Sequence, residues 1–183
     1  MYIDELKGQE VNDMNTVKEL HNEKIELIPE EAGIYYFLLP NGFQIEVLEE
    51  TEGLVRYRKW DKKKKDYVMK ESRYDTKDLI KRVIQYQTNS DNNVIYIGSA
   101  VNLRERIRAF IDFRFDDIQN FHYHSGGRSV WQIKNNIDLL VAWKTVEVPE
   151  GSIAKDYVRM IERQEIDNHI EKYGCKPFAN RRR

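Results

Sequence analysis

The segment "NNVIYIGSAVNLRERIRAF", residues 92–110, contains the features that decide the fold. A short apolar run ends in Tyr-Ile-Gly at residues 96–98, which is typical of a buried β-strand. Asn102 follows as a good helix N-cap, and Glu105 three residues later completes a capping-box pattern. The segment therefore predicts a strand whose end leads directly into an arginine-rich helix.

The predicted helix has an apolar face with one arginine at its border. Four residues share that face and are expected to pack on a sheet: Leu103, Ile107, Phe110 and Ile111. Arg106 falls beside this stripe, at a semi-buried position from which it leans toward the strand end that carries Tyr96. Desolvating an arginine alone costs several kcal/mol, so this side chain needs an anion. A phosphate fits the planar guanidinium.

A second strand, "AGIYYF" at residues 32–37, places Tyr35 two residues after Gly33. Apolar periodicity and turn residues predict further elements around the two tyrosine strands, with the first strand running to residue 39. Strands are expected at 43–50, 54–60, 66–71 and 138–148, and helices at 15–24, 75–87 and 152–174. The pair at 54–60 and 66–71 forms a hairpin whose tip is a solvated lysine run. Helix 75–87 buries Leu79, Val83 and Ile84.

These elements predict one α/β domain over residues 1–183, of the α+β kind. Its core is a small, mostly antiparallel, three-stranded central sheet flanked by helices. The segment 41–91 is an insertion that carries a β-hairpin and a helix.

Composition limits the classes of function. The net charge is −1, so any attraction to nucleic acid depends on local clusters of arginine and lysine. The single cysteine, Cys175, forms no internal disulfide, which favours a reducing compartment. No apolar run approaches the length of a membrane helix, and the acidic first residues do not resemble a signal peptide. We therefore expect a soluble cytoplasmic protein without a membrane partner.

The two tyrosine strands resemble the two halves of the signature of the GIY-YIG endonucleases: Gly-Ile-Tyr at 33–35 and Tyr-Ile-Gly at 96–98. In that family an arginine lies ten residues after the second tyrosine, in a helix opened by Asn/Asp-Leu. Asn102-Leu103 and Arg106 match that spacing. The family signature ends with a helical glutamate, a proline and an asparagine, which correspond here to the helix 152–174, Pro177 and Asn180.

The resemblance implies a metal-dependent DNA endonuclease that hydrolyses phosphodiester bonds. It implies that the helical glutamate holds Mg²⁺ or Mn²⁺ and that Arg106 stabilises charge on the phosphoryl oxygens. A tyrosine, either Tyr35 or Tyr96, accepts the proton of the attacking water, and Asn180 orients the site through hydrogen bonds.

Two glutamates compete for the metal. Glu162 follows Ile161 and has Ile166 four residues later, which matches the apolar surroundings of the family glutamate. Glu165 lies nearer the centre of the helix's own apolar face. Glu162 is the preferred metal ligand, and Glu165 stays open as the alternative.

The chain departs from the family at several positions. A lysine follows the second glycine in some branches, and a histidine follows the arginine by one turn in others. Ser99 and Phe110 stand at those positions here. These departures leave a second hypothesis, a catalytically weak or inactive nucleic-acid-binding module. Residues expected to contact DNA are Gly98, Arg104, Arg108, His124 and Arg128, with His122 beside them. The insertion 41–91 contacts DNA, mediates a homodimer, binds a protein partner or only decorates the sheet.

Overall fold

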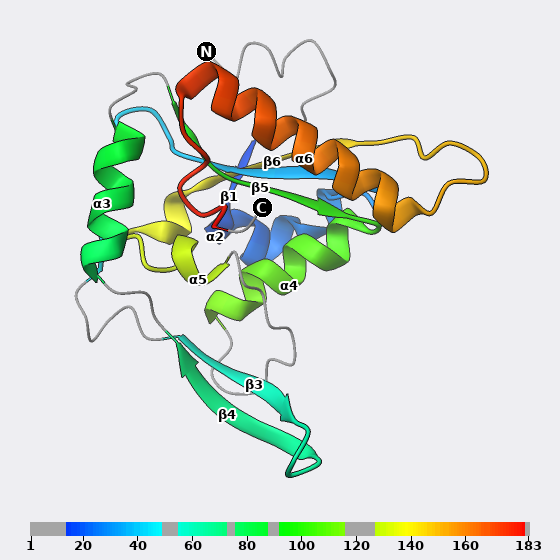
Figure 1. Ribbon diagram of the computed structural model, residues 1–183, viewed down its shortest axis with the longest axis horizontal. Coiled ribbons are helices and arrows are strands. Elements are labelled where there is room, and N and C mark those ends of the chain that lie inside the picture. The colour runs from blue at the N-terminus through cyan, green and yellow to red at the C-terminus, as the bar shows by residue number, and fades with distance from the viewer. Residues whose placement is uncertain (1–13, 49–54, 73–75, 88–91, 116–126, 182–183) are drawn as a thin grey trace.

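The computed structural model describes residues 14–48, 55–72, 76–87, 92–115 and 127–181, without the side chains of 55–58, 72 and 128. The protein is mixed α/β (Figure 1). Its strands are β1 (Asn15–Thr16), β2 (Gly33–Leu38), β3 (Val55–Asp61), β4 (Asp66–Ser72), β5 (Val94–Ala100) and β6 (Leu140–Thr145). Its helices are α2 (Val17–Glu19), η1 (Leu20–Lys24), η2 (Ile25–Leu27), α3 (Thr76–Gln87), α4 (Leu103–Phe115), α5 (Gly127–Val130), η3 (Asn136–Asp138) and α6 (Ala154–Tyr173). None of the helices in these ranges has the length and apolarity needed to cross a membrane.

The central sheet is antiparallel, with the strand order β1-β6-β2-β5. The prediction of three strands was wrong by one, because the short β1 pairs with β6 through Asn15↔Val141 and Thr16↔Leu140. This pairing covers part of the edge that β6 would otherwise leave open. The other edge belongs to β5, the strand that carries Tyr96.

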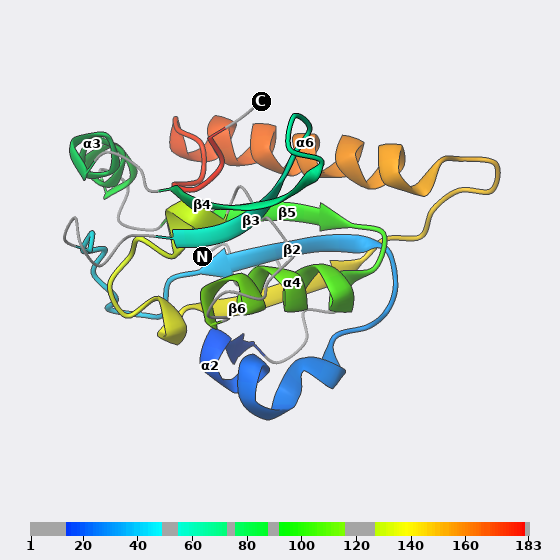
Figure 2. The same ribbon diagram turned by 90° about the horizontal axis from the view of Figure 1, so that it is seen from below.

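The two faces of the sheet are covered by different helices. Figure 2 shows α4 on one side of the sheet and α6 on the other. Tyr35, Phe37 and Tyr96 pack in one cluster with the apolar face of α4, whereas Ile34 and Tyr36 pack with residues of α6. Successive side chains of a strand point to opposite faces. Because helices cover both faces of β2, every residue of this strand is buried, and its sequence is a continuous apolar run.

The insertion agrees with the sequence in two elements and disagrees in a third. β3 and β4 form the predicted hairpin as a separate two-stranded sheet, and α3 forms the predicted helix. In the described part of the strand expected at 43–50, only an isolated bridge forms, Val47↔Ile133, and residues 49–50 lie outside the described residues. In α3 the side chain of Ile84 is 61% exposed and Tyr86 is buried instead. Leu79, Val83 and Tyr86 follow the i, i+4, i+7 spacing of one helix face.

The segment after α6 runs along the open edge of β5. The N–H of Ala179 donates to the carbonyl of Ile95 at 2.8 Å. The side chain of Asn180 hydrogen-bonds both backbone groups of Ile97. Its Oδ1 accepts from the Ile97 N–H at 2.9 Å, and its Nδ2 donates to the Ile97 carbonyl at 2.8 Å. Helix α3 holds this segment in place, because Arg82 donates to the Phe178 carbonyl at 2.6 Å. The backbone groups at this part of the sheet edge are thus satisfied, as buried polar groups require.

A buried histidine joins α6 to the start of β5. His169 Nδ1 lies 2.8 Å from the carbonyl of Cys175, and its Nε2 lies 3.0 Å from Oδ1 of Asn92. Burial lowers the pKa of His169 below its ordinary value. The hydrogen bond to the Cys175 carbonyl acts in the opposite direction on this pKa, but burial outweighs it, so the folded protein favours the neutral ring more than the unfolded chain does.

This lowered pKa predicts acid destabilisation. Above the ordinary histidine pKa of about 6.5, His169 is neutral in both states and the free energy of unfolding is at its full value. As the pH falls below about 6.5, the free energy of unfolding decreases, because the unfolded chain binds the proton more readily than the folded protein. One proton limits the change to about 1.4 kcal/mol per pH unit. We expect the free energy of unfolding in urea to fall between pH 7.5 and 5.5, and to fall less in His169→Gln. Equal pH dependence in the two proteins would contradict the assignment.

Candidate active site

Two tyrosines meet across the β2–β5 pair. Tyr35 lies opposite Gly98, two register positions from the Phe37↔Tyr96 pair. The ring centroids of Tyr35 and Tyr96 are 5.9 Å apart, and the two hydroxyl groups hydrogen-bond with each other. Both side chains are buried. Phe110 of α4 packs against them, with centroids 5.3 Å from Tyr96 and 6.3 Å from Tyr35. The position at which some branches of the family carry a histidine is therefore part of an aromatic core here.

Gly98 makes room for the ring of Tyr35. A Cβ atom at Gly98 would lie 2.5 Å from the Tyr35 hydroxyl oxygen and would also overlap ring carbons. The structure gives this glycine a packing role, which is to let Tyr35 lie across β5 toward Tyr96. Close approach of the Gly98 backbone to DNA stays a prediction.

Gly98→Ala is therefore expected to destabilise the protein by about 1–3 kcal/mol, since the aromatic ring must leave its position. Urea unfolding measures this loss. In a Tyr35→Leu background the cost of Gly98→Ala should fall, because the overlapping atoms are gone. The same cost in both backgrounds would show that the glycine is needed for another reason.

Arg106 reaches the tyrosine pair from α4. Its guanidinium hydrogen-bonds the Tyr35 side chain and acts electrostatically on both tyrosines. The expectation of a semi-buried position was wrong, because Arg106 is exposed. It lies on the solvent side of the Leu103–Ile107 stripe, so a charged ligand can reach it without entering the core.

The electrostatic environment opposes ionisation of either tyrosine. Burial raises the pKa of Tyr35, while Arg106 and the hydrogen bond from Tyr96 act in the opposite direction. Burial raises the pKa of Tyr96 well above its ordinary value, and the neighbouring Tyr35 and Glu162 raise it further. In both cases Arg106 is the cation that favours the phenolate.

Glu162 is the carboxylate that belongs to this group. It projects from α6, accepts a hydrogen bond from the hydroxyl of Ser99 and acts electrostatically on Tyr35 and Tyr96. Glu165 instead forms an ion pair with Lys144 of β6, 2.5 Å from Nζ to Oε1, and both side chains are mostly buried. The geometry thus favours Glu162 over Glu165 as the carboxylate of the candidate site.

Two contributors were missed by the sequence reasoning. Ser99, which stands where some GIY-YIG endonucleases have a lysine, donates to Glu162. Strand alternation could have found it, because Ser99 pairs with Ile34, which faces α6. Lys144 also pairs with Ile34 and faces the same helix, but only the three-dimensional structure shows that it engages Glu165.

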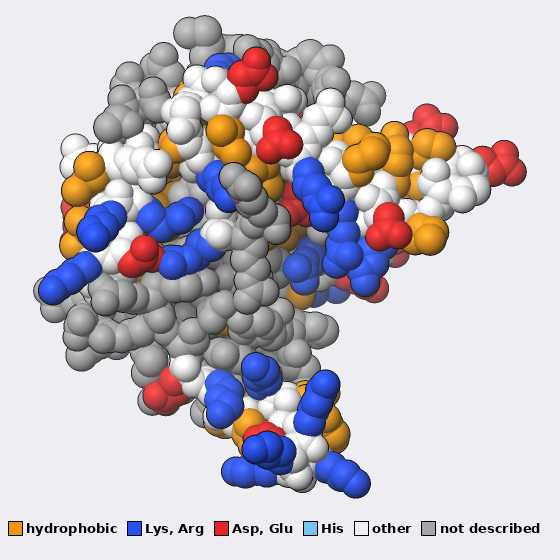
Figure 3. All heavy atoms as spheres, viewed as in Figure 1, with side chains coloured by type: hydrophobic (Ala, Val, Ile, Leu, Met, Phe, Trp, Pro, Cys, Tyr) orange, Lys and Arg blue, Asp and Glu red, His pale blue; other side chains and the backbone are white. Residues whose placement is uncertain are grey.

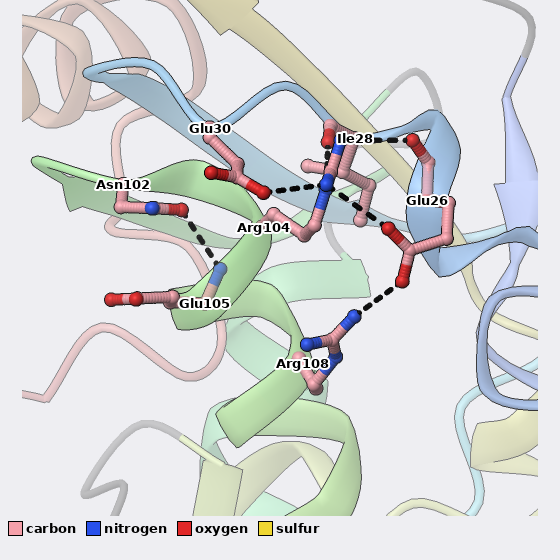
Figure 4. A network of polar contacts seen from close by, with 7 residues as sticks. All are labelled: Glu26, Ile28, Glu30, Asn102, Arg104, Glu105 and Arg108. Atoms are coloured by element: carbon pink, nitrogen blue, oxygen red, sulfur yellow. Dashed lines mark hydrogen bonds and ion pairs between the residues drawn. The ribbon is translucent and has the colours of Figure 1, made fainter.

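Arg104 and Arg108 have protein partners (Figure 4). Arg104 donates to the carbonyl of Ile28 at 2.7 Å and forms ion pairs with Glu26 at 3.0 Å and Glu30 at 2.6 Å. Arg108 pairs with Glu26 at 2.7 Å. These contacts fasten the η2 region to α4, so Arg104 has a structural role. DNA binding by these two arginines stays a prediction, and it would have to compete with these partners.

The remaining predicted contacts lie elsewhere. His122 and His124 fall outside the described residues, as does the side chain of Arg128. Asn180 makes the hydrogen bonds expected of it, and their partner is the backbone of Ile97, next to Tyr96. It therefore positions the strand that carries the second tyrosine.

The donor groups suit a cation that needs few protein ligands. Across the described ranges, no three His, Cys, Asp or Glu side chains gather in an arrangement that could hold a metal. Mg²⁺ prefers oxygen ligands and keeps several waters, so the Glu162 carboxylate alone is a chemically adequate anchor.

Comparisons with protein-family models, with curated proteins and with solved structures found no significant match.

Proposed function

We propose that this protein is a metal-dependent DNA endonuclease of the GIY-YIG type, hydrolysing phosphodiester bonds. The observation that supports this best is the convergence of Tyr35, Tyr96, Arg106 and Glu162 from four different elements. The first and last of these residues, Tyr35 and Glu162, lie about 130 positions apart in the sequence. A coincidence of three-letter motifs would not require their side chains to interact.

Arg106 is proposed to bind the scissile phosphate. Its guanidinium is exposed, carries a permanent charge and is held at one side by the Tyr35 hydroxyl. As the water oxygen bonds to phosphorus and the bond to the 3′ oxygen breaks, negative charge grows on the phosphoryl oxygens. A preorganised cation at that point lowers the barrier.

The tyrosine pair is proposed to accept the proton of the attacking water. Free tyrosine is a poor base at neutral pH, because its pKa is about 10, and burial makes ionisation harder still. The phenolate becomes accessible only when nearby positive charge offsets this burial. Arg106 already acts in that direction on both tyrosines, and Tyr35 also hydrogen-bonds it directly.

Glu162 is proposed to hold the divalent cation, Mg²⁺ or Mn²⁺. When bound, such an ion supplies Lewis-acid polarisation of the phosphate. The Ser99 hydroxyl fixes one carboxylate oxygen of Glu162 and leaves further lone pairs for a ligand.

A nucleic-acid-binding module without cleavage activity is the second candidate. The raised pKa values of both tyrosines and the burial of Phe110 in place of a histidine favour it. Its DNA binding would persist in EDTA with no product.

Nicking of supercoiled plasmid, with Mg²⁺ or with EDTA, tests the proposal. We expect open-circular product only with the metal. Binding of the same DNA is measured by gel shift in EDTA. Binding without nicking under any metal would replace the proposal with the second candidate. If the chain neither binds nor nicks the DNA, both candidates are excluded.

A further inference from the structure

The β3–β4 hairpin carries a surface that the candidate active site does not use. Figure 1 shows it projecting away from the sheet and helices, and among the described residues its strands pair only with each other. Trp60 and Tyr67 face each other across the hairpin with ring centroids 5.2 Å apart, yet they are 49% and 48% exposed. Met69 on the same hairpin is 44% exposed.

The aromatic pair has a stabilising role, but that role does not explain its exposure. A cross-strand aromatic pair contributes about 0.5–1.5 kcal/mol to a hairpin, which is otherwise marginal in isolation. About half of the surface of each ring stays exposed all the same. Apolar side chains gathered on an exposed, projecting element are typical of an interaction surface.

The charges around the patch indicate the kind of partner. Residues 59–71 contain six lysines and three acidic residues. Two of the acids are engaged with backbone N–H groups: Asp61 Oδ1 accepts from Lys63 at 2.8 Å and from Lys64 at 3.2 Å, and Asp66 accepts from Tyr67 at 2.7 Å. The Asp61 contacts form the turn and lower the pKa of its carboxyl. The lysines of the tip are exposed, and Figure 3 shows blue side chains around the hairpin.

We infer that this hairpin is a DNA-binding element in which the tip lysines contact phosphates and Trp60 and Tyr67 stack on unpaired bases. Lysine charge provides sequence-independent attraction to the DNA backbone. Aromatic rings stack on exposed bases of any sequence, which is the common mode of single-strand binding. The inference concerns binding alone and holds whether or not the candidate active site cuts.

Trp60 provides a direct readout. The chain has three tryptophans, and Trp131 and Trp143 are buried. Titration of the full chain with a thymidine 20-mer, in EDTA, should quench the tryptophan emission to a saturating level. Trp60→Phe should remove that quenching. Quenching that persists in Trp60→Phe, or that never appears, would overturn the inference.

The lysines are tested by the salt dependence of binding, measured by fluorescence anisotropy. Each phosphate contact contributes about 0.7 to the slope of log K against log salt for single strands. Lys63→Gln/Lys64→Gln should therefore reduce the slope by about 1.4. The matched control Lys18→Gln/Lys155→Gln removes two exposed lysines elsewhere and should leave it unchanged. Equal slopes in the two double variants would contradict the inference.

Further measurements separate the alternatives. A chain that is quenched by the oligonucleotide but never nicks plasmid would lose only the nuclease proposal and would leave this inference standing. If the chain nicks plasmid but shows no quenching, only the hairpin inference is overturned. Quenching by phosphatidylserine vesicles but not by the oligonucleotide would overturn it in favour of a membrane surface. Equal quenching by a 20-base-pair duplex would overturn stacking on unpaired bases.

Discussion

Arg106→Ala is expected to reduce metal-dependent plasmid nicking by about 10²–10³-fold, the usual effect of removing one preorganised donor to transition-state charge. The substitution removes both the cation at the proposed phosphate position and the charge that favours ionisation of the tyrosine pair. Arg106→Lys keeps the charge without the planar fork and should lose less. Initial nicking rates at saturating Mg²⁺ measure both variants.

The loss must come from chemistry and not from unfolding. Arg106 is exposed but hydrogen-bonds the buried Tyr35 side chain, so the alanine variant should lose about 1 kcal/mol of unfolding free energy and still be folded in the nicking assay. Arg159→Ala, an exposed arginine on α6, is the control for lost positive charge and should nick like the wild type. If Arg106→Ala nicks as fast as Arg159→Ala, Arg106 is not part of the reaction.

Local signals in the sequence predicted the elements around the site well. Asn102 caps α4, with Oδ1 accepting from the Glu105 N–H at 3.0 Å, and Gly174 ends α6 in the left-handed conformation at φ 68°. These features depend on residues within one turn of each other, so a local pattern is sufficient. The two-residue strand Asn15–Thr16 has no such pattern and exists because β6 offers an edge.

Long-range contacts explain what the sequence did not predict. The ion pairs of Arg104 form only because the chain at 26–30 folds back over α4, and contact of Arg104 with DNA stays a prediction. Arg106 was placed beside the apolar stripe correctly, yet its exposure depends on how the whole helix lies on the sheet. The partners of Arg104 lie 74 to 78 positions away in the sequence, so the local periodicity of the helix does not indicate them.

The choice between the glutamates shows the same limit. The spacing of apolar residues around Glu162 and Glu165 left both open. The structure separates them through partners on two different strands: Ser99 of β5 donates to Glu162, and Lys144 of β6 pairs with Glu165. One carboxylate is neutralised by a cation of the protein itself. The other lies beside the tyrosines without such an ion pair among the described contacts.

Glu162→Gln is accordingly expected to abolish nicking, by about 10³-fold or more, since loss of the charged anchor removes several kcal/mol of metal-dependent stabilisation. Glutamine keeps an acceptor for Ser99, so the fold should be retained.

Glu165→Gln is the matched control. It leaves Lys144 mostly buried without its partner, which should lower stability by about 1–3 kcal/mol. Its nicking rate, measured well below its unfolding temperature, should stay within about five-fold of the wild type, a difference of about 1 kcal/mol. Activity lost in Glu165→Gln and kept in Glu162→Gln would assign the metal to Glu165. Activity kept in both would remove the carboxylate of α6 from the mechanism.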